Sequence, residues 1–504
     1  MSILYPSAKH DRFSHSIGTY HLGQKAFDGF FTNAAPLIFE NISNLSPQKF
    51  LQQRRDNYRD SFLLACLLHD VGHAPFSHTC EDLYCYKSPK SGQLSELEED
   101  LLDKIMNFDI SYFSQSEKNE FEADFRHFFG NNSKDIKDKD KDKDLHPAPH
   151  ETMSALIILE KYDLFKKCFT DSGQTKSPLL DFIIRAILGC TYGVSHKDSP
   201  ECVLDKGIRN CLILLLNSKT VDVDKLDYIA RDSLMSGYQN VVLDNERLLS
   251  SLCYVKKTEG DYVPAFNKSA LSVLNNVIAA KNSQAKWIFN HPITVYDHYL
   301  LNRCIVTVLK HLAVNGSHVS FDEIKKQMFD LSTLSKEGNK ITTECRIMLL
   351  SDADIIYLIK QVLSSGNGAG DTEGAVEEFL NRGARRSPVW KSKEEYCYSL
   401  YDNTDKDNKI RRQISDFFMP LITNVTGVED LSHSQVINEA YYNEIMSKKD
   451  TIYGADLLLN ILNCLKDFCG DQYIFDFVFL IPKVNYQNAI DNKIIENIYQ
   501  PYLF

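Results

Sequence analysis

Five side chains that can carry charge or form polar bonds crowd into ten residues directly after an apolar run. In LLACLLHDVGHAPFSH the apolar run ends at residue 68, and it is followed by His69, Asp70, His73, Ser77 and His78. Imidazoles and a carboxylate placed where apolar side chains should pack need compensation, because a buried polar group without a partner costs free energy. A divalent metal ion or a phosphorylated ligand supplies it. The cluster therefore predicts a metal or phosphate site.

Two distant segments offer matching side chains. His15 lies in KHDRFSHSIG, and Asp224 lies in DVDKLDYIARD. Together with His69 and Asp70 they provide two imidazoles and two carboxylates from three predicted helices. Mixed nitrogen and oxygen ligands suit Fe, Mn, Zn, Ni or Co and leave positions for water and a phosphate oxygen. A lone histidine on a helix is most often a core residue with satisfied hydrogen bonds, but His15 does not stand alone.

Helical periodicity supplies the elements that must position these groups. Apolar positions recur at three- and four-residue spacing in residues 15–31, 60–70, 151–169, 178–192, 208–218, 223–234 and 268–313. Residues 85–149 form a charged insertion with five Lys and five Asp between residues 134 and 144. Such a tract is typical of a solvated loop, with a lid or partner contact as the alternative. We expect a mainly α protein, with a helical core over residues 1–314 and a mixed α/β region over residues 315–504.

Composition excludes several classes of protein. The chain has 504 residues, 43% of them hydrophobic, and a formal net charge of −12. It can bury a large core, and it lacks the excess of Lys and Arg that a broad nucleic-acid surface needs. The thirteen cysteines are scattered singly, which favours reduced thiols in the cytoplasm. The N-terminus does not show the pattern of a secretory leader, and we expect no membrane span.

The motifs together resemble the HD-domain deoxynucleoside triphosphate triphosphohydrolases. HDRFSHSIG, LLHDVGHAPFSH, HET at residues 150–152 and DVDKLDYIARD follow one another in the order of that family, over roughly residues 6–300. The resemblance implies an HD-superfamily helical fold and hydrolysis of a dNTP to a deoxynucleoside and inorganic triphosphate. It implies a divalent metal cofactor, with Mn, Fe, Mg, Zn, Ni and Co all open. The implied metal ligands are His15, His69, Asp70 and Asp224.

The resemblance also implies roles for the flanking residues. The expected substrate-binding residues are Arg12, Lys225, Tyr228, Asp232, Tyr296 and His298, with Lys286 in place of a family arginine. The planar fork of Arg12 suits a phosphoryl oxygen better than a lysine would. The expected catalytic residues are His73, His78, Glu81 and His150. We expect water activated at the metal to attack the α-phosphorus, and His78 or a neighbour to protonate the leaving 5′ oxygen.

Three features depart from the family pattern. The chain begins almost at the Arg12 motif, whereas relatives carry an upstream segment that helps to recognise the deoxyribose, so sugar discrimination is open. The charged insertion lengthens the separation between His78 and His150, although loop closure costs only about 0.6 kcal/mol per doubling of length. Glu81 stands where the family usually has an aspartate.

Three classes of function remain open. The first is a dNTP triphosphohydrolase, expected to be a cytoplasmic homo-oligomer that binds a nucleotide substrate and a nucleotide effector. The second is an HD phosphohydrolase that acts on another nucleotide or on a nucleic-acid phosphoester. The third is a nucleotide-sensing interaction protein whose HD site is structural, which the four intact ligands disfavour.

Overall fold

A computed structural model gives the fold of two compact units. The first unit comprises Met1–Phe289 and Asp322–Asp352, and the second comprises Asn290–Phe321 and Ala353–Phe504. The structure describes residues 5–33, 47–81, 94–129, 146–162, 179–195, 198–237, 242–258, 261–289, 291–315, 339–340, 346–347, 351–364 and 375–381. The charged tract at residues 134–144 and the chain beyond residue 381 lie outside these ranges. The domain boundary expected at residue 314 stays a prediction.

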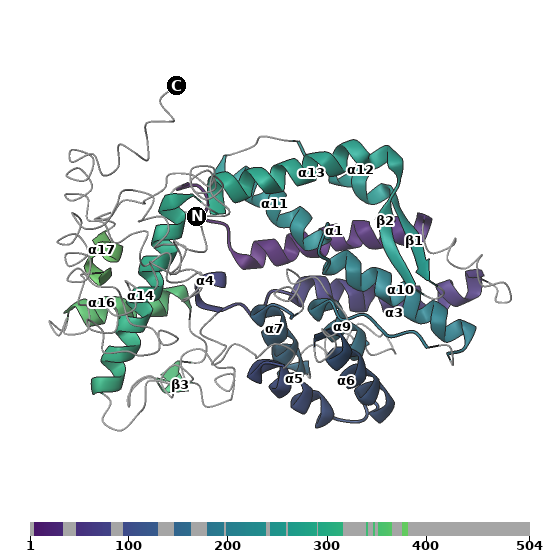
Figure 1. The fold of residues 1–504 in the computed structure, drawn as a ribbon, viewed down its shortest axis with the longest axis horizontal. Coiled ribbons are helices and arrows are strands. Elements are labelled where there is room, and N and C mark those ends of the chain that lie inside the picture. Colours follow the sequence, from purple (N-terminus) through teal and green to yellow (C-terminus); the bar gives the residue numbers. More distant parts are fainter. Residues whose placement is uncertain are drawn as a thin grey trace, which may run out of the picture. The chain divides into compact units, whose positions relative to one another are not determined.

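Helices form most of the first unit (Figure 1). They are α1 (Arg12–Asn33), α3 (Pro47–Leu68), α4 (His78–Glu81), α5 (Glu96–Met106), α6 (Gln115–Phe129), α7 (Pro149–Glu160), α9 (Leu180–Leu188), α10 (Pro200–Leu216), α11 (Val223–Ser236), α12 (Asn245–Ser250) and α13 (Leu271–Gln284), with a 3₁₀ turn at Lys268–Ala270 and a π-helical turn at Ala285–Phe289. None of the described helices is long and apolar enough to cross a membrane. The mainly α fold predicted from apolar spacing is confirmed for the described residues.

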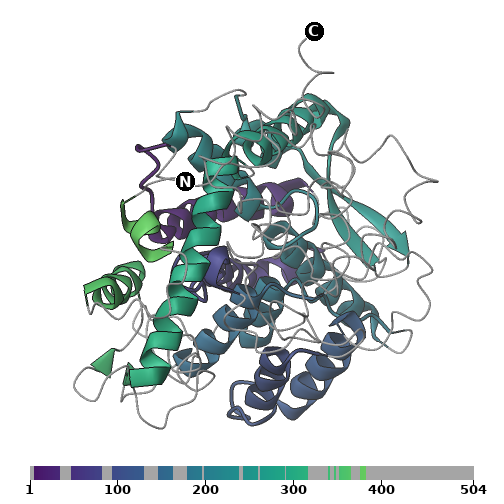
Figure 2. The same ribbon diagram turned by 60° about the vertical axis from the view of Figure 1, so that its left-hand side comes forward.

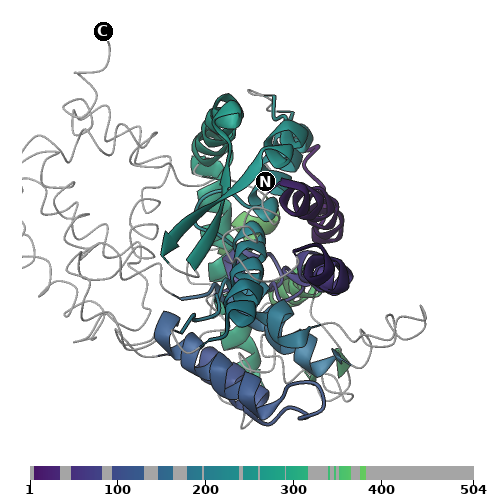
Figure 3. The same cartoon turned by 90° about the vertical axis from the view of Figure 1, so that its right-hand side faces the viewer.

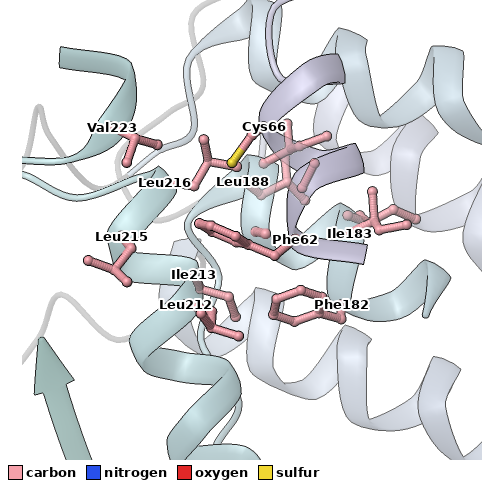
Figure 4. Close-up of a cluster of buried hydrophobic side chains, with 14 of the residues drawn as sticks. Phe62, Cys66, Phe182, Ile183, Leu188, Leu212, Ile213, Leu215, Leu216 and Val223 are labelled. Atoms are coloured by element: carbon pink, nitrogen blue, oxygen red, sulfur yellow. The ribbon is translucent and has the colours of Figure 1, made fainter. Parts of the chain in front are cut away.

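Helices α1, α3, α9 and α10 pack around the core of the first unit. Helix α1 lies beside α3 and α11, and the turned view of Figure 2 shows α1 and α3 side by side. Helix α9 packs against α3, α7 and α10. It is buried along its whole length, because its other residues are apolar and its two charged residues, Asp181 and Arg185, form an ion pair. Figure 4 shows side chains of α3, α9 and α10 meeting, among them Phe62, Phe182 and Leu212.

A β-hairpin follows α12 where the apolar spacing predicts no element. Strands β1 (Leu252–Thr258) and β2 (Asp261–Phe266) pair antiparallel, with Val255 opposite Val263. Strand β2 packs on α10, and Figure 3 shows the two strands running together. The period-two signal is weak because two adjacent lysines interrupt it within seven residues. A short pair, β3 (Asn339–Lys340) and β4 (Arg346–Ile347), also belongs to this unit.

The second unit is helical where the structure describes it. Helix α14 (Pro292–Asn315) packs against α17 (Ala375–Asn381), and α16 (Asp352–Ser364) falls almost wholly in the same unit. The helical stretch predicted over residues 268–313 is thus divided into α13 and α14. Pro292 begins the second helix because proline has no N–H to donate and fits the first turn. Most of the predicted α/β region at residues 315–504 lies outside the described residues.

Candidate metal centre

The His69-Asp70 pair lies in the turn directly after α3. His69 Nδ1 is 2.9 Å from the carbonyl oxygen of Cys66 and donates to it, so the Nε2 lone pair of a neutral ring faces the other way. That Nε2 is buried and has no hydrogen-bond partner. It lies 3.4 Å from Asp70 Oδ1 and 3.4 Å from Asp224 Oδ1. The turn therefore aims this ring nitrogen at two carboxylates.

Helix α7 holds this turn in place from the other side. Ser154 Oγ donates to the carbonyl oxygen of His69 at 2.7 Å and accepts from the Gly72 N–H at 2.8 Å. A Cβ at Gly72 would lie 2.3 Å from the backbone nitrogen of Ser154, so only glycine allows this approach. Ser154 was not among the predicted site residues, and its place in MSALIILE gives no chemical signal.

His15 reaches the same point from the first turn of α1. Its Nε2 lies 3.0 Å from Asp224 Oδ1 and 3.5 Å from Asp70 Oδ2. Its Nδ1 lies 2.7 Å from Asp227 Oδ2, which fixes the ring. Arg231 in turn binds both carboxylate oxygens of Asp227, at 2.8 and 2.9 Å. Asp227 was missed by the sequence analysis, although it lies three residues after Asp224 and four before Arg231.

The structure brings together the four predicted metal ligands, here called the metal quartet: His15, His69, Asp70 and Asp224. Two ring nitrogens and two carboxylates converge, and the partnerless Nε2 of His69 is the kind of atom that a metal ion satisfies. Burial opposes protonation of His15, but the carboxylates of Asp224 and Asp227 outweigh it and raise its pKa to about 10. Carboxylates that stabilise a protonated imidazole this strongly also attract metal cations. The residues of the metal quartet therefore fit a divalent metal ion.

The predicted catalytic residues form a second group, here called the histidine cluster: His73, His78, Glu81 and His150. Glu81 Oε1 lies 2.5 Å from His73 Nδ1 and 3.0 Å from His78 Nδ1, and Oε2 lies 3.1 Å from His150 Nδ1. The His73 and His150 rings are stacked with centroids 3.9 Å apart. His73 Nε2 also lies 3.2 Å from Asp70 Oδ1. The two groups are therefore adjacent.

Arg12, at the start of α1, contacts both the metal quartet and the turn before α4. Its Nη1 pairs with Asp70 Oδ2, and its Nε donates to Ser77 Oγ at 2.9 Å. Ser77 and its neighbour Phe76 have φ values of 57° and 58°, a left-handed conformation that is uncommon for residues other than glycine. The side chain of Arg12 is 36% exposed. It therefore stands at the edge of the site.

The predicted substrate-binding residues of α11 differ in their contacts and surroundings. Lys225 Nζ donates to the carbonyl oxygen of Ser218 at 2.8 Å and to Asp222 Oδ2 at 2.5 Å, at the start of the helix. Burial, followed by the charges of Asp224 and Asp222, raises the pKa of the half-buried Tyr228. Asp232 Oδ1 lies 2.7 Å from His10 Nε2, a contact that was not predicted.

The remaining predicted substrate residues lie farther along the chain. Tyr296 and His298 belong to α14 of the second unit, where the Tyr296 hydroxyl donates to Glu378. Lys286 belongs to the π-helical turn at the end of the first unit. Their contacts with a substrate stay predictions.

The sequence is similar to parts of one named enzyme homolog and of two uncharacterized proteins. No family model matches it. It is 24% identical over 263 residues to the deoxynucleoside triphosphate triphosphohydrolase SAMHD1 homolog of Dictyostelium discoideum, which is 51% of this chain and 34% of that protein. It is 32% identical over 303 residues to the uncharacterized protein YwfO of Bacillus subtilis, 60% of this chain and 46% of that protein. It is also 23% identical over 286 residues to the uncharacterized MG461 homolog of Mycoplasma pneumoniae, 57% and 46% of the two chains.

The chain thus spans less than half the length of each of these relatives.

Proposed function

We propose that the chain is a metal-dependent phosphohydrolase that converts a dNTP and water into a deoxynucleoside and inorganic triphosphate. The convergence of the metal quartet beside ionisable histidines carries this proposal. The similarity to a dNTP triphosphohydrolase homolog supports the reaction class. When bound, a divalent ion polarises phosphoryl oxygens and lowers the pKa of water.

Arg12 is the residue best suited to hold the triphosphate. Two of the five guanidinium N–H groups contact Asp70 and Ser77, which orients the fork and leaves donors for phosphate oxygens. A half-exposed, oriented guanidinium loses little entropy when it binds an anion in a bidentate manner. Arg12 therefore links substrate binding to the carboxylate of the metal quartet.

His78 is the best candidate for the proton donor to the leaving 5′ oxygen. The neighbouring Glu81 carboxylate raises the pKa of His78, which favours the protonated ring. Because Nδ1 faces Glu81, the transferable proton is the one on Nε2. Its side chain is 72% exposed, so a ligand can reach it. Burial lowers the pKa of His73 instead, which suits that ring to a neutral, orienting role.

Product analysis tests the proposal. The full chain is incubated with Mn²⁺ and each dNTP and rNTP, singly and in mixtures, and the products are separated by ion-exchange chromatography. Deoxynucleoside and triphosphate in equal amounts are expected, and Asp224→Asn should abolish both. Asp205→Asn is the control, because Asp205 is an aspartate that pairs with Arg209 and lies outside the metal quartet.

The position of the broken bond is tested with ¹⁸O-labelled water. Attack at the α-phosphorus breaks the bond between that phosphorus and the 5′ oxygen, so the label should appear in triphosphate and be absent from the nucleoside. Orthophosphate or a nucleoside monophosphate as the product would overturn the proposal. It would favour an HD phosphohydrolase with a different substrate.

A further inference from the structure

We propose that the histidine cluster is a second metal site, which binds one Zn²⁺-type ion in addition to the ion of the metal quartet. Its four side chains, His73, His78, Glu81 and His150, can each offer one ligand atom, and these atoms all lie within 4.8 Å of one another. The proposal does not depend on which nucleotide the protein hydrolyses.

One carboxylate faces three imidazole nitrogens. The Nδ1 atoms of His73, His78 and His150 lie 2.5, 3.0 and 3.1 Å from the oxygens of Glu81. Ligands about 2.0 to 2.1 Å from a tetrahedral zinc ion are separated by about 3.3 Å. Small outward shifts of these four groups would therefore give an ion its ligand distances without unfolding an element.

Hydrogen bonding alone does not satisfy this arrangement. His73 Nδ1 and Glu81 Oε1 are both buried and lack a hydrogen bond of acceptable geometry, although they lie side by side. His73 Nε2 faces Asp70 Oδ1 at 3.2 Å. A neutral imidazole has one N–H, so if Nε2 donates to Asp70, the lone pair of Nδ1 points at the carboxylate of Glu81. A cation between the two lone pairs removes this repulsion.

The donor set selects the class of ion. Three imidazole nitrogens and one carboxylate oxygen suit Zn²⁺ and Co²⁺, whereas Mg²⁺ and Ca²⁺ prefer oxygen ligands. The contact of His73 Nε2 with Asp70 resembles the orienting carboxylate that commonly stands behind a metal-binding histidine. The ion would take the place of a proton between His78 Nδ1 and Glu81, so the proton-donor role proposed for His78 applies to the chain whose second site is empty.

Metal content tests the inference without any nucleotide. The full chain is stripped with a chelator, dialysed against Zn²⁺, washed, and analysed by inductively coupled plasma mass spectrometry. Two equivalents of zinc per chain are expected for the wild type and one for Glu81→Gln or His150→Gln. Asp224→Asn should also bind one, and Asp224→Asn combined with His150→Gln none. His127→Gln, an exposed histidine of α6, is the matched control and should bind two.

Absorption of the Co²⁺-loaded wild type gives a second measurement that does not require any variant to fold. Two four-coordinate equivalents with nitrogen and oxygen ligands are expected, and binding by cysteine would add a sulfur charge-transfer band. One equivalent in the wild type, or two equivalents in both Glu81→Gln and His150→Gln, would overturn the inference. If the wild type binds one equivalent and still releases triphosphate, the second site is rejected and the proposed function stands.

Discussion

Replacing Asp227 by asparagine tests whether the carboxylate behind His15 sets the affinity of the metal quartet. Asp227 Oδ2 accepts from His15 Nδ1 at 2.7 Å, and Arg231 holds both carboxylate oxygens. The carboxylate keeps the proton on Nδ1 and leaves the Nε2 lone pair for the metal. An amide of the same shape preserves the packing, but it removes the charge that makes the ring basic.

The expected loss follows from this geometry. Removing a carboxylate that orients a metal-binding histidine typically weakens metal binding 10- to 100-fold. This corresponds to about 1.4 to 2.7 kcal/mol of binding free energy. Asp227→Asn should therefore bind metal weakly, and saturating metal should restore much of its activity. Asp224→Asn removes a ligand itself, so excess metal should not rescue it.

The affinity of the metal quartet for its ion is measured by competition with a chromophoric chelator, at metal concentrations low enough to fill the metal quartet before any other site. Asp205→Asn is the control, because Asp205 pairs with Arg209 at 2.8 Å with the same four-residue spacing and touches neither metal group. The reasoning is refuted if Asp227→Asn binds within twofold of the wild type. It is equally refuted if the control loses as much affinity as Asp227→Asn.

Three further predictions concern Gly72, His78 and Glu151. Gly72→Ala should lower the free energy of unfolding by about 1 to 3 kcal/mol, because its Cβ meets the backbone of α7 at 2.3 Å; an unchanged urea midpoint would contradict this. His78→Gln should lower kcat about 10²- to 10⁴-fold while the quartet keeps its metal, as steady-state kinetics and metal analysis would show. Burial raises the pKa of Glu151 from 4.5 to about 7. The unfolded chain therefore loses this proton first, and stability should fall by about 3 kcal/mol as the pH rises through that window. Glu151→Gln should remove that slope in urea unfolding with a chelator present, and an identical slope in both proteins would exclude this origin.

The sequence predicted the residues of the candidate metal site better than it predicted the residues that hold them in place. His15, His69, Asp70 and Asp224 could be grouped from the sequence because all four are metal-ligand residue types and lie in motifs that follow one another in the order of one family. Their grouping in space is what the structure adds. Expectations on the cytoplasm, the homo-oligomer and the nucleotide effector stay predictions.

The supporting residues could not be selected from the sequence. Asp227 is one of several carboxylates in DVDKLDYIARD, and only the crossing of α1 and α11 shows which of them lies behind His15. Ser154 is a small polar residue in an apolar helix, a setting in which serine most often bonds within its own helix. The hairpin at residues 252–266 was missed because strand pairing depends on a partner surface, here α10, more than on a seven-residue pattern.

The double contact of Ser154 with the turn after α3 has a consequence for how the protein can vary. His150 and Ser154 lie one turn apart on α7, so the bonds of Ser154 to His69 and Gly72 also set the position of His150. The number of residues between α6 and α7 is therefore decoupled from the geometry of the histidine cluster. Residues such as the Lys-Asp tract can therefore be inserted into that connection, while the Ser154 hydroxyl keeps His150 in place beside the turn after α3.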